Sequence, residues 1–161
     1  MFSGEAPYRG KEVLENIRRL LHKARETGMP VVFVRHNDDD EMKYGTGLWQ
    51  IVAEITPAEG EARVDKRTRD SFFQTNLDEI LKSLGAKTLI FCGMQTEYCV
   101  DTTCRRACTL GYDAYLASDG HTTYDSAVLP AEKIVAHHNH VLPTRFLKVK
   151  TTAKLISMME G

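Results

Sequence analysis

Apolar residues recur along the chain at two alternating periods, one typical of helices and one typical of buried strands. The first helix is predicted from Val13, Leu14, Ile17, Leu20, Leu21 and Ala24, which recur at helical spacing, and Gly28 ends it. A short and wholly apolar segment, Val31–Val34, follows this helix. Segments of this kind are typical of strands in parallel sheets whose two faces are both covered.

The same alternation continues toward the C-terminal end. Further strands are predicted at Ala62–Lys66, Thr88–Cys92, Asp113–Ala117 and Phe146–Val149. Helices are predicted from Asn76 to Gly85, from Glu97 to Leu110, from Pro130 through Val135, and after Thr151. This order predicts an α/β fold with a mostly parallel sheet. We expect a single domain over residues 1–161, because the chain shows no repeat and no second composition.

Composition and charge argue against several kinds of partner. The net charge is −1, and this balance favours neither nucleic acid nor an acidic membrane surface. No apolar run is long enough to span a bilayer, and the first residues lack the regions of a signal peptide. Three of the four cysteines fall in one predicted helix, where disulfide geometry is poor. We therefore interpret the cysteines as free thiols in a reducing cytoplasm.

Cys99 is the first candidate for chemistry. It follows the strand Thr88–Cys92 at the start of the next predicted helix, for which Thr96 is the expected N-cap. In open parallel sheets, sites form at the carboxyl ends of strands, and the amides of a helix start favour a thiolate or an oxyanion. The alternative is a buried packing role, which free cysteines commonly have. The other cysteines, Cys92, Cys104 and Cys108, are interpreted as core or near-core residues.

Two basic residues also follow predicted strands. Lys66 ends the strand Ala62–Lys66, where an ammonium group could hold a thiolate, although most lysines are solvated surface charges. His36 follows Val31–Val34 and points to the same edge of the sheet. We expect no bound metal and no cofactor, because the cluster of His137, His138 and His140 falls on the wrong side of a helix for that edge.

The segment Gly93–Gly120, which begins GMQTEYCVDTTC, resembles the signature of the isochorismatase-like cysteine hydrolases. That signature reads Gly-x-x-Thr-x-x-Cys-Val-x-x-Thr, and here Gly93, Thr96, Cys99, Val100 and Thr103 occupy its positions. The segments ENIRRLLHKARETGMPVVFVRH and VDKRTRDSFFQTNLDEIL resemble the family's first helix with its following strand and its lysine segment. The resemblance covers nearly the whole chain.

The resemblance implies a three-layer α/β/α fold and a catalytic trio of aspartate, lysine and cysteine. By motif, Cys99 takes the position of the nucleophile and Lys66 that of the lysine. The family's cis peptide falls at Met94–Gln95, and the backbone amides of Gln95 and Cys99 would form the oxyanion hole. The family's metal ligands have no match in the segment Arg35–Trp49, so the resemblance implies activity without metal.

The function implied is that of a cysteine amidohydrolase, which cleaves a C–N bond of a small amide or N-carbamoyl compound through a thioester. We expect a small-molecule substrate and assembly into homo-oligomers. The pocket walls are predicted, from topology alone, to include His36, Trp49 and Phe72. One alternative is a catalytically impaired binding or assembly protein of the same fold. A redox-sensing thiol protein is a third, weaker interpretation.

The family aspartate is the one member of the trio with no match here. In the family it ends the first strand, in an Asp-x-Gln motif, whereas this sequence opens on a loop-like segment and a helix. By resemblance, that strand would lie in the middle of the sheet, between Val31–Val34 and Thr88–Cys92. We therefore expect that the natural chain has one more strand and that a chain beginning at Met1 is poorly stable and nearly inactive.

Overall fold

The computed structural model describes residues 6–160, which form the alternating pattern of strands and helices that the sequence predicts. The strands are β1 (Val32–His36), β2 (Ala62–Lys66), β3 (Thr88–Met94), β4 (Asp113–Thr122) and β5 (Lys148–Lys150). The helices are α1 (Gly10–Glu26), α2 (Leu77–Ser83), α3 (Asp101–Thr109), α4 (Ala131–Arg145) and α5 (Thr152–Met159). Two short turns complete the order, the 3-10 helix η1 (Ala53–Ile55) and the π-helix η2 (Thr96–Val100).

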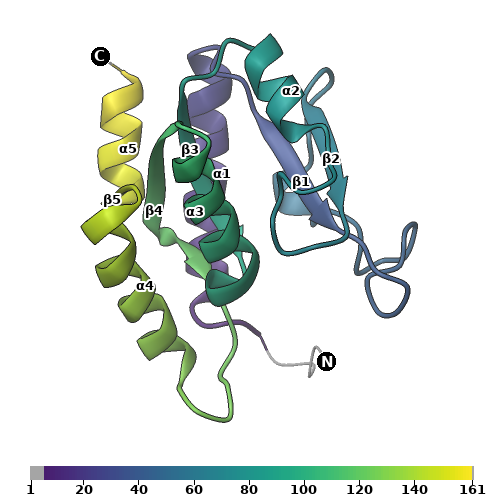
Figure 1. The fold of residues 1–161 in the computed structure, drawn as a ribbon, viewed down its shortest axis with the longest axis vertical. Helices are drawn as coiled ribbons and strands as arrows, with labels where there is room; N and C mark the ends of the chain where they lie inside the picture. The colour runs from purple at the N-terminus through teal and green to yellow at the C-terminus, as the bar shows by residue number, and fades with distance from the viewer. Residues whose placement is uncertain (1–5, 161) are drawn as a thin grey trace.

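The strands form two separate parallel sheets within residues 6–160. One sheet pairs β1 with β2, and the other has the order β3-β4-β5. Figure 1 shows the two sheets next to each other, with α1 behind β3 and α3 in front of it. The family resemblance places a further strand between β1 and β3. These two strands do not pair with each other within residues 6–160.

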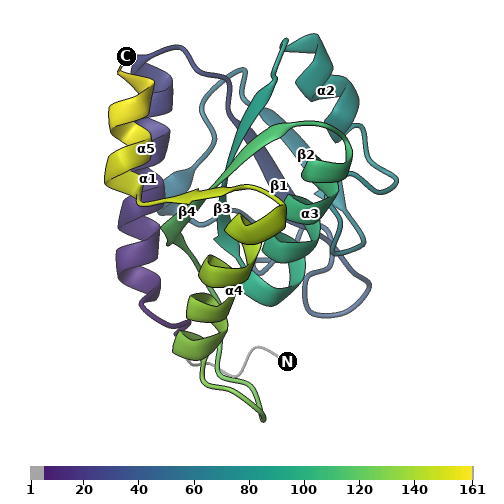
Figure 2. The same ribbon diagram turned by 60° about the vertical axis from the view of Figure 1, so that its left-hand side comes forward.

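Helices cover both faces of the larger sheet, as the predicted layer order requires. Leu116 of β4 packs with Val100, Cys104 and Leu142 on the side of α3 and α4. The next residue, Ala117, packs with Leu20 of α1 and Leu155 of α5 on the opposite side. This switch between successive residues is the two-residue period of a strand that is buried on both faces. Figure 2 shows α1 and α5 side by side on their face of the sheet.

A third apolar cluster joins the small sheet to the large one. Val64 of β2 packs with Phe72, with Leu77 and Leu81 of α2, and with Ala107 of α3. Leu89 and Phe91 of β3 and Val32 of β1 lie against this cluster. Because the two sheets share no backbone hydrogen bonds within residues 6–160, their relative position depends on this side-chain packing.

Several predicted boundaries differ from the structure. The helix predicted from Glu97 begins as the π-helical turn η2 and becomes α-helical only at Asp101. The last strand is Lys148–Lys150 and not Phe146–Val149, because α4 continues through Pro143 and Phe146 becomes its C-cap. Thr151 caps α5 as predicted, since its side chain accepts a hydrogen bond from the Lys154 amide.

Candidate active site

Lys66 and Cys99 come together across the junction of the two sheets. Lys66 is the last residue of β2, and Cys99 lies in η2, directly after β3. The Lys66 Nζ donates a hydrogen bond to Cys99 Sγ at 3.0 Å and another to the Thr68 carbonyl oxygen at 2.7 Å. Lys66 is 4% exposed. A nearly buried ammonium group therefore points at a sulfur atom, and an ammonium group in this place stabilises the thiolate form of a cysteine.

His36 lies beside this pair because of the strand register. His36 and Lys66 are register partners at the carboxyl ends of β1 and β2. The His36 Nδ1 is 3.5 Å from Lys66 Nζ, and its Nε2 is 3.2 Å from Nη1 of Arg69. Burial, followed by the positive charges of Lys66 and Arg69, lowers the pKa of His36. The imidazole is thus neutral at pH 7 and lies between two cations.

The turn that carries Cys99 has an unusual backbone. Gly93 has a φ of 126°, a region that L side chains rarely adopt, which accounts for the glycine of the signature. The peptide bond between Met94 and Gln95 is cis, at the position that the resemblance implies. The Gln95 carbonyl accepts hydrogen bonds from the amides of Tyr98 and Val100. The role of the Gln95 and Cys99 amides as an oxyanion hole stays a prediction.

The structure separates Trp49 and Phe72 from this group. The Trp49 ring stacks on the Arg35 guanidinium at 3.7 Å and its Nε1 donates to Asp65. Asp65 precedes Lys66 on β2, so the two side chains leave opposite faces of the strand. Phe72 is a buried core residue that stacks on Tyr112. Of the three predicted pocket residues, only His36 contacts Lys66.

Thr96 has a different role from the predicted N-cap. Gln95 takes the N-cap position, and the Thr96 hydroxyl instead lies 2.8 Å from His121 Nδ1. The His121 Nε2 is 3.0 Å from Asn139 Oδ1, and Asn139 Nδ2 donates to the Ser118 carbonyl. An acceptor at Nε2 places the ring proton there, so Thr96 donates to Nδ1. This buried chain of hydrogen bonds ties the Cys99 turn to β4 and α4.

Thr103, the last residue of the signature, fixes the loop that follows Lys66. Its hydroxyl donates to the Arg69 carbonyl at 3.3 Å and accepts from the Ser71 amide at 3.2 Å. Both Ser71 and Thr103 are buried. These roles of Thr103, His121 and Asn139 were not predicted from the sequence. Thr103 belongs to the signature, which indicated that it could have a role. The contacts of His121 and Asn139 form only in the folded chain, so no sequence motif indicated them.

The remaining cysteines differ from Cys99 in their surroundings. All four cysteines are free thiols. Cys104 is fully buried, as predicted, and burial raises the pKa of its thiol far above the ordinary value. Cys92, which was predicted to lie in or near the core, is an exposed residue. It lies where the register of β3 and β4 shifts, and the protein atoms packed around its sulfur still raise its pKa to about 11.

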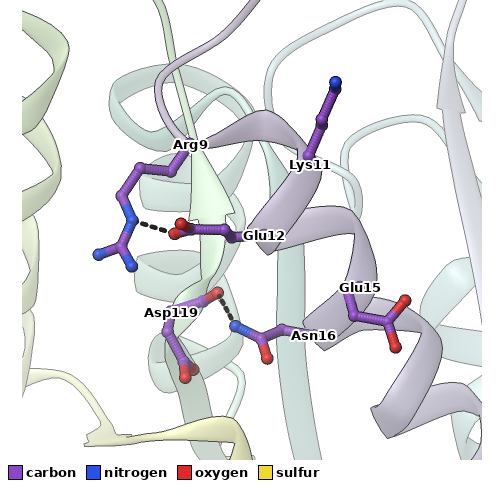
Figure 3. A pocket seen from close by; sticks show the side chains of 6 residues that line it. All are labelled: Arg9, Lys11, Glu12, Glu15, Asn16 and Asp119. Atoms are coloured by element: carbon purple, nitrogen blue, oxygen red, sulfur yellow. Dashed lines mark hydrogen bonds and ion pairs between the residues drawn. The ribbon is translucent and has the colours of Figure 1, made fainter.

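A surface pocket away from Lys66 and Cys99 is lined by polar side chains of α1 and β4. The pocket in Figure 3 lies along the first turns of α1 and is lined by Arg9, Lys11, Glu12, Glu15, Asn16 and Asp119. Its polar groups are largely engaged with each other, since Arg9 pairs with Glu12 and Asn16 donates to the Asp119 carbonyl. Within residues 6–160, no group of three or more histidine, cysteine, aspartate or glutamate side chains could hold a metal ion. No helix of this part of the chain is long and apolar enough to cross a membrane.

The α/β fold brings a lysine and a cysteine together at the carboxyl ends of two parallel strands, as in a class of α/β hydrolases, and comparison with known proteins identifies the family. The model of the isochorismatase domain matches residues 1–151. The chain belongs to the isochorismatase family. A secreted isochorismatase effector of Verticillium dahliae is 37% identical over 123 residues, which are 74% of this chain and 65% of that protein.

Solved structures and relatives with named activities agree with this assignment. The crystal structure of an isochorismatase from Pseudomonas putida superposes with a TM-score of 0.89 at 34% identity, covering 92% of this chain and 79% of that one. A streptothricin hydrolase of Streptomyces noursei is 33% identical over 78% of this chain and 46% of its own length. A nicotinamidase of Arabidopsis thaliana is 28% identical over 71% of this chain and 66% of its own. The chain thus spans two thirds or less of these curated relatives.

Replacing Lys66 by methionine should slow the alkylation of Cys99 by iodoacetamide at pH 7, on the order of tenfold. The ammonium group that stabilises the thiolate is lost, whereas a side chain of similar length remains. The rate is measured on the Cys99 peptide by mass spectrometry. Lys82→Met is the control, because Lys82 is exposed and pairs with Asp78. Equal Cys99 rates in wild type and Lys66→Met would contradict the role of Lys66.

Acidification should destabilise the fold through His121. Burial lowers the pKa of His121, so the unfolded chain takes up a proton near pH 6.5 that the folded chain resists. This contribution to stability is intact above that pH and is lost as the pH falls toward the lower, folded pKa. Between pH 7 and 5, the loss from one such group is at most about 2 kcal/mol.

Urea unfolding of His121→Asn at both pH values measures this contribution. The variant should lose less unfolding free energy on acidification than wild type. His140→Asn, which alters an exposed histidine of α4, should keep the wild-type pH dependence. The same pH dependence in His121→Asn and wild type would show that His121 does not carry the effect.

Proposed function

We propose that this protein is a cysteine amidohydrolase that cleaves a C–N bond of a small amide or N-carbamoyl compound. The observation that carries the proposal is the 3.0 Å contact between the nearly buried Lys66 ammonium group and Cys99 Sγ. Support also comes from relatives named as a nicotinamidase and a streptothricin hydrolase. The thiolate forms of Cys104 and Cys92 are disfavoured, because the protein atoms packed around each sulfur raise the pKa of both thiols.

In the proposed mechanism, the Cys99 sulfur attacks the carbonyl carbon and the C–N bond then breaks. The thiol proton leaves with the nitrogen, as ammonia or an amine, and the acyl group stays on the sulfur as a thioester. Water then adds to the thioester, and the acid and the free thiol are released. Before the attack, the Lys66 ammonium group stabilises the negative charge on the Cys99 sulfur. The backbone amides of Gln95 and Cys99 would receive the oxyanion of each tetrahedral intermediate.

The proton transfers require a general base. Within residues 6–160, no carboxylate forms an ion pair with Lys66, whose contacts are Cys99, Thr68 and His36. By the family resemblance, the base would be an aspartate at the end of a strand between β1 and β3. The alternative is a catalytically impaired binding or assembly protein of the same fold, and activity measurements distinguish the two.

We further propose a cytoplasmic location and homo-oligomeric assembly. Four free thiols in one chain support a reducing compartment. Val128 is 86% exposed and its neighbour Leu129 is 46% exposed, on the loop before α4. Adjacent exposed apolar side chains of this kind offer a contact for a second copy.

Replacing Cys99 by alanine should abolish ammonia release from a panel of small amides while leaving the fold intact. The substitution removes the attacking atom and only a small volume. Cys108→Ala is the matched control, since Cys108 is a half-buried thiol of α3 with no contact to Lys66. Activity that survives in Cys99→Ala would refute the thioester mechanism. No ammonia release by the wild-type protein from any amide would favour the non-catalytic alternative.

Chelation should leave the activity unchanged, because the mechanism proposed here assigns no step to a metal ion. Ammonia release is measured before and after dialysis against EDTA, and again after addition of Zn²⁺ or Mn²⁺. A loss on chelation that either ion restores would overturn the metal-free proposal.

A further inference from the structure

Arg69 differs from the other arginines around the candidate site in the kind of group that its guanidinium contacts. Arg35 forms an ion pair with Asp65 at 2.8 Å, Arg67 with Asp39, and Arg106 lies 3.8 Å from Asp70. Within residues 6–160, no carboxylate pairs with Arg69. Its guanidinium lies 3.2 Å from His36 Nε2 and 5.8 Å from the ring of Tyr98, both neutral groups, and Asp38 Oδ2 is 4.0 Å from the same His36 nitrogen.

The position of Arg69 is fixed by the same elements that build the site. Its carbonyl accepts a hydrogen bond from Thr103 of α3, the helix that continues from the Cys99 turn. Its side chain reaches His36, whose other ring nitrogen faces Lys66. Tyr98, the second contact, precedes Cys99 and is 50% exposed. One imidazole ring therefore separates Arg69 from Lys66, and Arg69 is accessible to solvent whereas Lys66 is not.

Arg69 places a positive charge on the solvent-exposed side of this group. Its guanidinium lies next to a neutral imidazole and an aromatic ring. The carboxylate of Asp38 lies 4.0 Å from His36 Nε2 and, within residues 6–160, forms no ion pair with Arg69. A guanidinium group offers paired N–H donors that match the two oxygens of a carboxylate. A small amide that carries a carboxylate at its far end could bind both groups: its carbonyl carbon would lie at the Cys99 sulfur and its carboxylate at the Arg69 guanidinium.

We propose that Arg69 is a specificity-determining residue and that the substrate is a small amide or ureido compound carrying a carboxylate. This proposal rests on the proposed amidohydrolase function, because Cys99 is taken as the point of attack. Arg69 binds the carboxylate and so places the amide carbonyl at the sulfur. A neutral amide of the same size lacks this contact and is a poorer substrate.

The first experiment compares succinamate with its methyl ester, which has the same amide but no negative charge. Wild type should show a kcat/KM for succinamate at least about tenfold above that for the ester. Arg69→Gln should lose most of this ratio, and Arg69→Lys should keep part of it. Arg67→Gln is the matched control, an exposed arginine of the same loop that pairs with Asp39. A ratio that is unchanged in Arg69→Gln would overturn the proposal while leaving the hydrolase function standing.

The second experiment does not require turnover. Succinamate should protect Cys99 of wild type from iodoacetamide at a concentration about tenfold lower than in Arg69→Gln, whereas Arg67→Gln should behave as wild type. If no amide is hydrolysed, this measurement still decides the role of Arg69. Equal protection in wild type and Arg69→Gln, or none in either, would refute carboxylate binding by Arg69. Thermal unfolding of each variant verifies that it is folded.

Discussion

The hydrogen bond between Lys66 Nζ and Cys99 Sγ connects two sheets that share no backbone ladder within residues 6–160. Its two ends belong to β2 of the small sheet and to the turn after β3 of the large one. The geometry of the site therefore depends on how the sheets are packed. The cluster of Val64, Phe72, Leu81 and Ala107 holds them together, and the Ser71–Thr103 contact fixes the loop between Lys66 and that cluster.

The electrostatics of the site follow from this junction. Burying an ammonium group without a carboxylate is costly unless another group takes up the charge. Here the Thr68 carbonyl oxygen and the Cys99 sulfur atom accept hydrogen bonds from the buried ammonium group. His36 stays neutral because burial and the two neighbouring cations oppose its protonation. The positive charge that remains lies at the solvent side, on Arg69, where an anionic group of a substrate can reach it.

The turn that carries Cys99 is held by contacts on each side. Gly93 permits a positive φ next to the register shift between β3 and β4, and the Gln95 carbonyl accepts hydrogen bonds from the amides of Tyr98 and Val100. The Thr96 hydroxyl binds the buried His121, which in turn binds Asn139 of α4. A turn positioned in this way presents its sulfur atom in one orientation, which is the preorganisation that nucleophilic catalysis requires.

Local pattern in the sequence was sufficient for the order of strands and helices, because burial on both sheet faces imposes apolar runs such as Val31–Val34 and helical spacing such as that from Val13 to Ala24. The signature around Cys99, together with its lysine segment, indicated two residues that the structure brings into contact. The positions of Trp49 and Phe72 could not be predicted, because strand alternation and core packing turn their side chains away from Lys66. The neutral state of His36, the contact of Arg69 with His36 and the contact of His121 with Thr96 were likewise decided only by the tertiary structure. Each depends on groups roughly 25 to 35 positions away in the chain, which no local pattern can bring together.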